Sequence, residues 1–147
     1  MCLFSMNDEV WHEVPEHHGI RASSWGRILL PEGQAKTHNG GLRTYKTKPS
    51  YGCWAKGSGG GRYIYHWRKM GTLKIAKLVC LAFHGPMPFP KAVVMHLDEN
   101  SRNNRSDNLS WGTQKQNLNA PGFLTYCRGR IGDKNPVIKG RRKTILL

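Results

Sequence analysis

The chain has 147 residues, of which 38% are apolar, and this length suits one compact domain with extensions. Lysine and arginine total 23 against 9 aspartate and glutamate residues, so the net charge is +14. No run of eighteen apolar residues occurs and the N-terminus lacks a signal-peptide pattern, which excludes a membrane-spanning helix and favours a cytoplasmic protein. The four scattered cysteines include no C-x-x-C pair, so a zinc site built from thiolates is not expected.

The positive charge is unevenly distributed along the chain. Residues 1–50 carry six basic and five acidic side chains, whereas residues 51–95 carry seven basic side chains and no acidic ones. Residues 96–120 have three of each sign, and residues 121–147 have seven basic and one acidic. A basic field of this strength indicates a polyanionic partner, for which nucleic acid is the commonest choice. A ribosome-associated or simply basic protein is the alternative.

The first half of the sequence predicts mainly short strands. Residues 10–14 and 27–30 can form two strands around the turn at Gly19. A third strand is predicted over residues 44–48, where successive side chains alternate between two faces. A fourth strand, 62–67, is rich in aromatic and β-branched residues. The aromatic face of this fourth strand can either pack on the core, which we favour, or contact DNA.

One helix is predicted over residues 72–83, with Thr72 as its N-cap. Apolar side chains recur along this segment at the spacing of one helical face, namely Ile75, Leu78, Val79, Ala82 and Phe83. We therefore expect this helix to be the main core helix, with Cys80 buried in it.

The most informative stretch runs from Val93 to Ala120. An apolar run predicts a strand that ends at His96, and the polar residues 98–107 predict a loop. Residues 107–111 predict a second strand, and Thr113 is a plausible N-cap for a short helix through Asn119. Pro121 and Gly122 are expected to end that helix. A strand–loop–strand–helix unit can bring one side chain from each piece to a common point.

Three residues in this stretch are spaced in a recognisable way: twelve positions separate His96 from Asn108, and nine separate Asn108 from Asn117. Together with Leu109-Ser110 after Asn108, they make the stretch resemble the HNH endonucleases with a ββα-metal active site, in their phage and homing branch. The resemblance implies a small α+β domain with a ββα-metal (His-Me finger) motif, an N-terminal β module and a basic C-terminal arm. It also implies metal-dependent hydrolysis of DNA, with nicking by a monomer or double cutting by a homodimer, in a phage or mobile-element protein.

The N-terminal segment resembles the small modular motif that precedes some nucleases of this family. The matching positions are Trp11, Pro15, Gly19, Ile20, Ala22, Ser23, Gly26, Arg27 and Ile28. The resemblance implies a role in placing DNA, and a hairpin that merely packs on the core is the alternative. We accordingly divide the chain into a β module (1–50), a nuclease core (51–120) and a basic tail (121–147).

The resemblance assigns a role to each residue of the centre. Histidine exchanges a proton near neutral pH, which suits His96 for the general base. Asn108 would hold the hairpin and orient the imidazole, and Asn117 would offer an amide oxygen to Mg²⁺ or Mn²⁺. Met95 stands where many members have a second metal ligand, and a thioether is a poor ligand for a hard cation. Asp98 is either its substitute or a cap of the loop.

Double-stranded DNA is the expected partner, and the expected contacts are basic side chains of all three segments. They are Arg27, Arg62, Arg68, Lys69, Arg102, Arg105, Lys115, Arg128, Arg130, Arg141 and Arg142. Two other interpretations remain: a DNA-binding protein whose nuclease centre has decayed at Met95, and, ranked last, an RNA-binding protein, because the aromatic RNA-binding strand signature is missing.

Overall fold

Short strands dominate the protein, with helices gathered towards its C-terminal half. The computed structural model describes residues 8–57 and 60–129. In chain order the elements are β1 (Trp11–Glu13), β2 (Arg21–Ser23), β3 (Ile28–Leu29), β4 (Gly33–Lys36), β5 (Leu42–Tyr45), β6 (Cys53–Gly57), β7 (Gly60–Trp67), β8 (Gly71–Lys74), α1 (Ile75–His84), β9 (Val93–His96), a 3-10 turn (Ser106–Asn108), β10 (Leu109–Gly112), α2 (Gln114–Leu118) and α3 (Pro121–Arg128). The predicted α+β class is confirmed.

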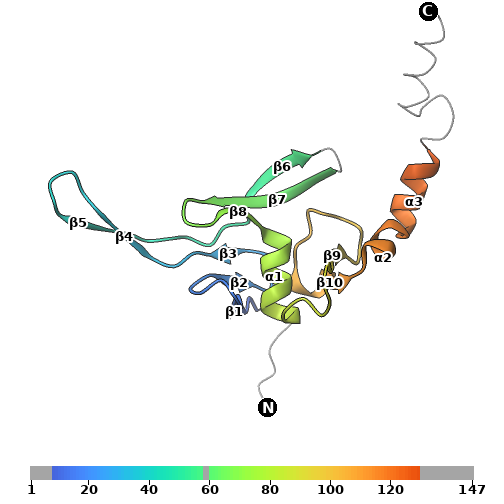
Figure 1. Cartoon of the computed structure of the whole chain (residues 1–147), viewed down its shortest axis with the longest axis horizontal. Helices are drawn as coiled ribbons and strands as arrows, with labels where there is room; N and C mark the ends of the chain where they lie inside the picture. The colour runs from blue at the N-terminus through green and yellow to red at the C-terminus, as the bar shows by residue number, and fades with distance from the viewer. Residues whose placement is uncertain (1–7, 58–59, 130–147) are drawn as a thin grey trace, which may run out of the picture.

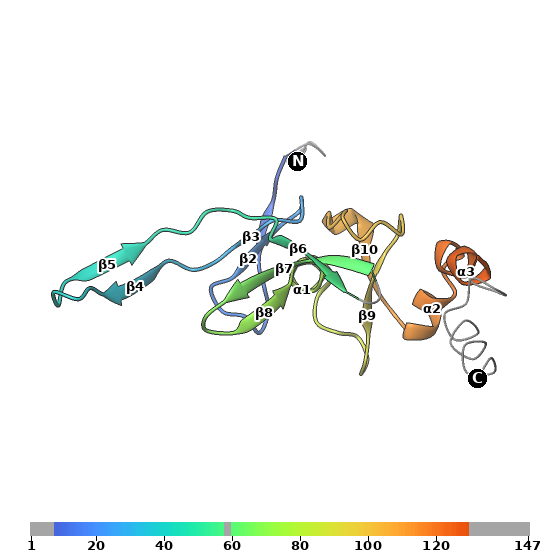
Figure 2. The same cartoon turned by 90° about the horizontal axis from the view of Figure 1, so that it is seen from above.

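The strands form four small antiparallel sheets. Two of them have three strands, in the orders β1-β2-β3 and β6-β7-β8, and the pairs β4-β5 and β9-β10 complete the set among the described residues. In both views α1 lies near the centre, between the β1–β3 sheet and the β9–β10 pair (Figures 1 and 2). Connections between neighbours are short, so most strands pair with the next strand in sequence.

A single hydrophobic core joins the N-terminal strands to the C-terminal half through α1. The helix buries Ile75, Leu78 and Val79, together with Cys80 and Leu81. The rest of the core comes from the stretch between the end of β1 and the start of β10, and consists of Val14, Ile20, Ala22, Ile28, Leu30, Leu73 and Leu109. Residues 8–30 are therefore packed into the same core as the segment that carries His96. Burial also raises the pKa of the Cys80 thiol to about 12, in keeping with its predicted place in the core.

The start of α1 differs from the prediction. The helix begins at Ile75 with Lys74 as N-cap, and no side chain caps it. Thr72 instead belongs to β8, where it pairs with His66, and its hydroxyl lies 2.9 Å from His66 Nδ1. The prediction failed because pairing with β7 continues to Lys74 and outweighs the capping preference of threonine. The aromatic side chains of β7 pack against the core, as favoured above.

Pro121 starts a new helix. It occupies the first turn of α3, where a proline costs nothing because the first amides of a helix lack intrahelical acceptors. The Glu99 carboxylate accepts hydrogen bonds from Gly122 N at 2.9 and 3.0 Å and so satisfies one of these amides. The expected end of the preceding helix is confirmed, because α2 stops at Leu118, but the new helix that begins at Pro121 was not anticipated. The rest of the predicted basic tail, from residue 130, lies outside the described residues.

The β4–β5 hairpin projects away from the remainder of the molecule, as Figures 1 and 2 both show. All four residues of β5 are exposed, and β4 alternates between half-buried and exposed positions. The strand β5 ends at Tyr45, three residues before the predicted end at residue 48. No helix in residues 8–57 and 60–129 is long and apolar enough to cross a membrane.

Candidate active site

The strand–loop–strand–helix unit forms as predicted. β9 and β10 pair with His96 opposite Leu109 and Met95 opposite Ser110. One boundary moves, because Asp107 and Asn108 lie in the 3-10 turn that precedes β10. Thr113 caps α2 as expected, and its side chain and that of Gln116 satisfy each other's backbone amides. This capping box fixes the start of the helix that carries Asn117.

His96 and Asn117 line one open cavity of about 860 Å³. Met95 and Glu99 line it too, and Glu99 carries the one carboxylate among the described residues on its wall. Three cationic side chains also face this space, those of Arg62, Lys74 and Lys77. The expected base and the expected metal ligand are thus brought to a common, positively charged cavity that can accept an anion.

The imidazole of His96 is held by Asn104, which the sequence had not singled out. Nε2 of His96 lies 2.9 Å from the side-chain oxygen of Asn104, which is only 6% exposed. A carbonyl oxygen can only accept, so Nε2 carries the proton and Nδ1 keeps its lone pair in the neutral ring. Asn104 thus fixes the tautomer that a general base needs. Its position inside an asparagine-rich loop was the only signal of this role in the sequence.

The turn between β2 and β3 packs against the backbone of Asn104. Gly26 has φ +88, and a Cβ placed on it would lie 2.7 Å from the backbone oxygen of Asn104. Only glycine can adopt this backbone conformation and still allow so close an approach. Nearby, Ser106 N donates to the backbone oxygen of Ser24 at 3.0 Å. The turn between β2 and β3 therefore supports the loop that positions the imidazole.

Asn108 organises the loop between β9 and β10, while the hydrogen bond to the imidazole comes from Asn104. The Asn108 side-chain oxygen accepts from Asp98 N at 3.0 Å. Its Nδ2 donates to Asp98 Oδ1 and to the backbone oxygen of Asn103, both at 2.8 Å. These three contacts tie the two ends of the loop together. The structure thus separates the two roles that the resemblance had assigned to Asn108.

Asp98 makes the contacts of a loop cap. Its carboxylate accepts from Asn103 Nδ2 at 2.9 Å and from Asn100 N at 2.8 Å, in addition to Asn108. These hydrogen bonds hold the pKa of the Asp98 carboxyl below its usual range, and the one from Asn103 has the largest effect on that pKa. Asp98 is absent from the wall of the cavity that contains His96. The geometry therefore agrees with the second of the two roles left open for it.

Met95 fills space beside Asn117 instead of offering a charge. A Cβ on Gly112 would lie 2.1 Å from the Met95 sulfur, so the thioether lies directly over that glycine. The residue is half-buried and lines the cavity. The absence of a side chain at position 112 is what allows the methionine to fold across β10.

The oxygen donors on the cavity wall include the Asn117 amide and the Glu99 carboxylate, which suit a hard divalent cation. No group of three or more His, Cys, Asp or Glu that could hold a metal occurs in the part of the chain that the structure describes. The donor set therefore fits a cation that takes its remaining ligands from water and phosphate. Glu99 was not anticipated, because nothing in its sequence context separates it from an ordinary loop acid.

The basic residues expected to contact DNA fall into different surroundings. Arg62 lies on the wall of the cavity, whereas Arg27 is engaged in an ion pair with Glu9. The guanidinium of Arg102 lies 4.0 Å from the centroid of the Trp54 ring, and Arg105 lies 3.6 Å from Asp107. Arg68, Lys69, Lys115 and Arg128 are exposed, as are Arg62, Arg102 and Arg105, whereas Arg27 is half-buried. Arg130, Arg141 and Arg142 lie outside the described residues.

The two strands β9 and β10 and the helix α2 form a ββα unit around this site, and comparisons with known proteins bear on its family. Residues 77–119 match the family described as HNH endonuclease, which confirms the resemblance for this segment. Among solved structures, the chain is similar to the HNH homing endonuclease I-HmuI, whose structure is titled as one of DNA binding and cleavage. The TM-score is 0.55 at 23% identity, over 92% of this chain and 68% of that chain. At this identity the likeness shows the fold. No curated protein matches the chain.

Proposed function

We propose that this protein is a divalent-metal-dependent DNA endonuclease that cuts one strand at a time. The observation that carries the proposal is the hydrogen bond from His96 Nε2 to Asn104, in a cavity that also contains Asn117 and three cations. A histidine held in one tautomer next to an anion-accepting space is the arrangement that phosphodiester hydrolysis requires. The family match of residues 77–119 supports this choice of reaction.

In the proposed mechanism, His96 acts as the general base. Its Nδ1 takes a proton from a water molecule, and the water oxygen attacks the phosphorus as the bond to the leaving sugar oxygen breaks. The leaving oxygen takes up a proton from solvent water, and the imidazolium later returns its proton to solvent. Asn104 is a positioning residue, because it keeps the proton on Nε2. Arg62, Lys74 and Lys77 supply positive charge to a phosphate in the cavity.

A Mg²⁺ or Mn²⁺ ion would stabilise the charge on the phosphate and on the leaving oxygen. We assign Asn117 and Glu99 as its protein ligands, since both line the cavity and carry oxygen. Glu99 also accepts from Gly122 N, and its carboxylate keeps further lone pairs for a cation. Asp98 is left with the loop, because it does not line the cavity and its carboxylate accepts from Asn103, Asn100 and Asn108. With so few protein ligands, metal affinity is expected to be weak until DNA adds its phosphate oxygens.

Double-stranded DNA is the proposed substrate, and the β4–β5 hairpin is a proposed contact. Residues 33–50 carry four basic side chains, Lys36, Arg43, Lys46 and Lys48, and no acidic ones. A two-stranded ribbon fits the major groove of B-DNA, and one strand of this ribbon, β5, is exposed along its whole length. A single centre cuts one strand, so a double-strand break would require two copies. Such an enzyme would act in the cytoplasm of a cell that harbours a phage or mobile element.

The test is relaxation of supercoiled plasmid across a series of Mg²⁺ and Mn²⁺ concentrations. Wild type is expected to give open circles, while His96→Ala and Asn117→Ala are expected to give at least about a hundredfold slower nicking. Equal rates for wild type and His96→Ala would remove this histidine from the mechanism.

Met95 favours a second candidate, a DNA-binding protein whose centre has decayed. This protein would retard duplex DNA in a gel with a steep dependence on salt, yet would not cut it with either metal. Restoration of cutting by Met95→Asp or Met95→His would support decay. Cutting by the wild-type chain would exclude it.

A further inference from the structure

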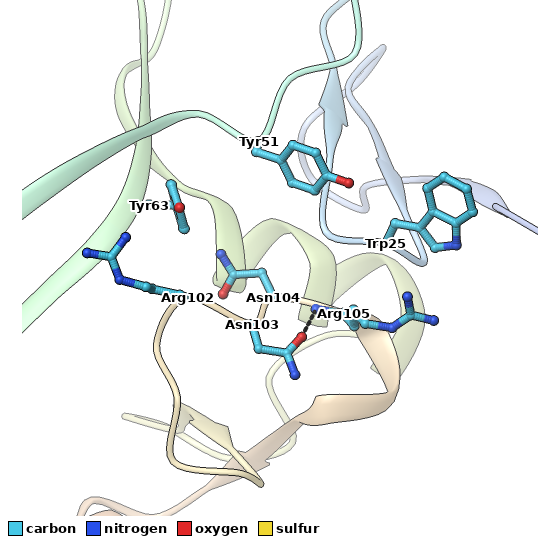
Figure 3. Close-up of a pocket in the computed structure, with 7 residues that line it drawn as sticks. All are labelled: Trp25, Tyr51, Tyr63, Arg102, Asn103, Asn104 and Arg105. Atoms are coloured by element: carbon cyan, nitrogen blue, oxygen red, sulfur yellow. Dashed lines mark hydrogen bonds between the residues drawn. The ribbon is translucent and has the colours of Figure 1, made fainter. Parts of the chain in front are cut away.

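A second cavity of about 390 Å³ adjoins the one that contains His96. Its wall comprises Trp25, Tyr51, Tyr63 and the loop residues 102–105, and we call it the aromatic pocket. Figure 3 shows the Tyr51 ring facing Asn103 and Asn104 across the open space, with Tyr63 and Trp25 to either side. Tyr63 and Asn104 line both cavities and so form the partition between them.

The side chains on this wall favour one kind of ligand. Three are aromatic, two are guanidinium groups and two are amides, and none of the seven is a carboxylate or an aliphatic chain. Aromatic faces stack on planar heterocycles, amides donate to and accept from their edges, and guanidinium groups bind phosphate. A nucleobase joined to phosphate combines these three properties.

Part of the wall is already fixed by contacts outside the pocket. Arg27 donates from Nε to Glu9 at 2.8 Å, and its guanidinium lies 5.7 Å and 5.9 Å from the ring centroids of Trp25 and Tyr51. These cation–π contacts hold the two rings in place. Since Glu9 neutralises Arg27, the charge left for a ligand comes mainly from Arg102, with Arg105 contributing through a guanidinium that also pairs with the exposed Asp107 at 3.6 Å.

Asn104 links the two cavities chemically as well as sterically. Its oxygen accepts the hydrogen bond of His96, whereas no hydrogen bond of the described residues involves its Nδ2. That amide nitrogen can donate to a base acceptor in the aromatic pocket without disturbing the imidazole. Occupancy of the pocket would thus fix the side chain that positions the general base.

We propose that the aromatic pocket binds one unpaired nucleotide of the DNA substrate, beside the bond that is cut. The inference rests on the proposed cleavage of DNA and adds that the enzyme selects locally unpaired or distorted duplex. A base inside a duplex cannot present both faces to aromatic rings, so it must leave the stack to enter. A substrate that already has an unpaired nucleotide avoids this cost and binds more tightly.

The experiment compares two duplexes of the same sequence, one fully paired and one with a single-nucleotide bulge. Fluorescence anisotropy of the full chain without metal gives both dissociation constants. Wild type is expected to favour the bulged duplex about tenfold, because unpairing costs on the order of a few kcal/mol. Tyr51→Ala is expected to reduce this ratio to below about twofold, and Tyr51→Phe, which keeps the ring, to preserve it.

Tyr45→Ala is the matched control. Tyr45 is 50% exposed and Tyr51 is 52% exposed, and each ring lies under an arginine, at 5.6 and 5.9 Å respectively. Tyr45 lies on β5, outside the aromatic pocket but in the hairpin proposed to contact DNA, so its removal is expected to lower both affinities alike and to leave their ratio near tenfold. This control separates stacking in the pocket from a general preference for flexible DNA.

An equal affinity of wild type for both duplexes would overturn the inference, as would an unchanged ratio in Tyr51→Ala. A third result would also overturn the inference: a deoxynucleoside monophosphate quenches tryptophan fluorescence, but the protein binds both duplexes equally well. The pocket would then be a site for free nucleotides. Nicking of plasmid that depends on His96 would survive either result. Loss of that nicking, with the bulge ratio intact, would reject the proposed function alone.

Discussion

The side-chain oxygen of Asn104 lies 2.9 Å from Nε2 of His96, and the two residues are separated by the loop that Asn108 and Asp98 close. Asn104→Ala is therefore expected to lower the nicking rate constant by about ten- to a hundredfold, because the tautomer and orientation of the base are no longer fixed. Single-turnover cleavage of plasmid measures the effect.

Asn104→Asp distinguishes positioning from a structural role. A carboxylate still accepts from Nε2 and also stabilises the protonated imidazole, so the acidic limb of the pH–rate profile should move to higher pH. A pH profile identical to that of wild type, in a folded variant, would contradict the assignment of Asn104.

A carboxylate at position 95 should strengthen metal binding. Met95 lines the cavity with Asn117 and Glu99, so the Met95→Asp side chain would add a hard oxygen ligand beside them. We expect Mn²⁺ affinity without DNA to rise about tenfold or more, which is about 1.4 kcal/mol in binding free energy. Isothermal titration calorimetry measures it. Met95→Leu controls for the change in packing and should match wild type.

Removal of the Asn108 side chain should destabilise the protein strongly. Asn108 is buried, and its amide satisfies Asp98 N and the backbone oxygen of Asn103. Asn108→Ala is expected to lower the free energy of unfolding by about 2–4 kcal/mol, as buried partners lose their hydrogen bonds. Urea denaturation gives the value. Asn100→Ala, whose exposed side chain accepts only from Arg102 N in the same loop, should cost less than about 1 kcal/mol.

Asp98 should make the free energy of unfolding depend on pH in the acidic range. Its folded-state pKa is lowered, first by Asn103, so the unfolded chain takes up the proton at a higher pH than the folded chain. The stabilisation by the ionised Asp98 carboxylate is fully present above the ordinary aspartate pKa of about 3.9, and it is lost as the pH falls through the lowered pKa of the folded state. The midpoint temperatures of thermal unfolding of wild type and Asp98→Asn should therefore become equal as the pH approaches about 2. A constant gap between the two down to that pH would refute the assignment.

The β4–β5 hairpin should account for part of the salt dependence of DNA binding. Lys36, Arg43 and Lys46 are all exposed on or directly after its strands. Exchange of the three for glutamine should reduce the slope of log affinity against log salt by roughly 2–3, at about 0.9 per phosphate contact. The same count of substitutions at Arg68, Lys69 and Lys115 gives a comparison surface. An unchanged slope in the hairpin variant would exclude the hairpin from the interface.

Sequence reasoning located the ββα unit because its signals are local. A strand ending at His96, a polar loop and a Thr113 cap each follow from short-range preferences, and all three occur in the structure. The α1 core face was found for the same reason, since Ile75, Leu78 and Val79 repeat at helical spacing.

The residues that complete the site were missed because long-range contacts select them. In the sequence, nothing local distinguishes Asn104 from its neighbours Asn100 and Asn103. Asn104 is the one whose side-chain oxygen contacts the imidazole eight positions away, and no local pattern encodes that choice. Glu99 likewise gains its role from Gly122, which lies 23 residues further along. Thr72 was misassigned because sheet pairing overrode its capping preference, and α3 was missed because a proline that follows one helix can equally begin the next.

The contact of Gly26 with the Asn104 backbone also limits how residues 1–50 could be exchanged with those of another protein of this fold. The turn at residue 26 and the loop at residue 104 must have complementary shapes, because no side chain fits between them. A chimera with residues 1–50 from another protein would keep His96 aligned only if its turn also carries a glycine there. The N-terminal strands and the loop that holds His96 are therefore expected to change together.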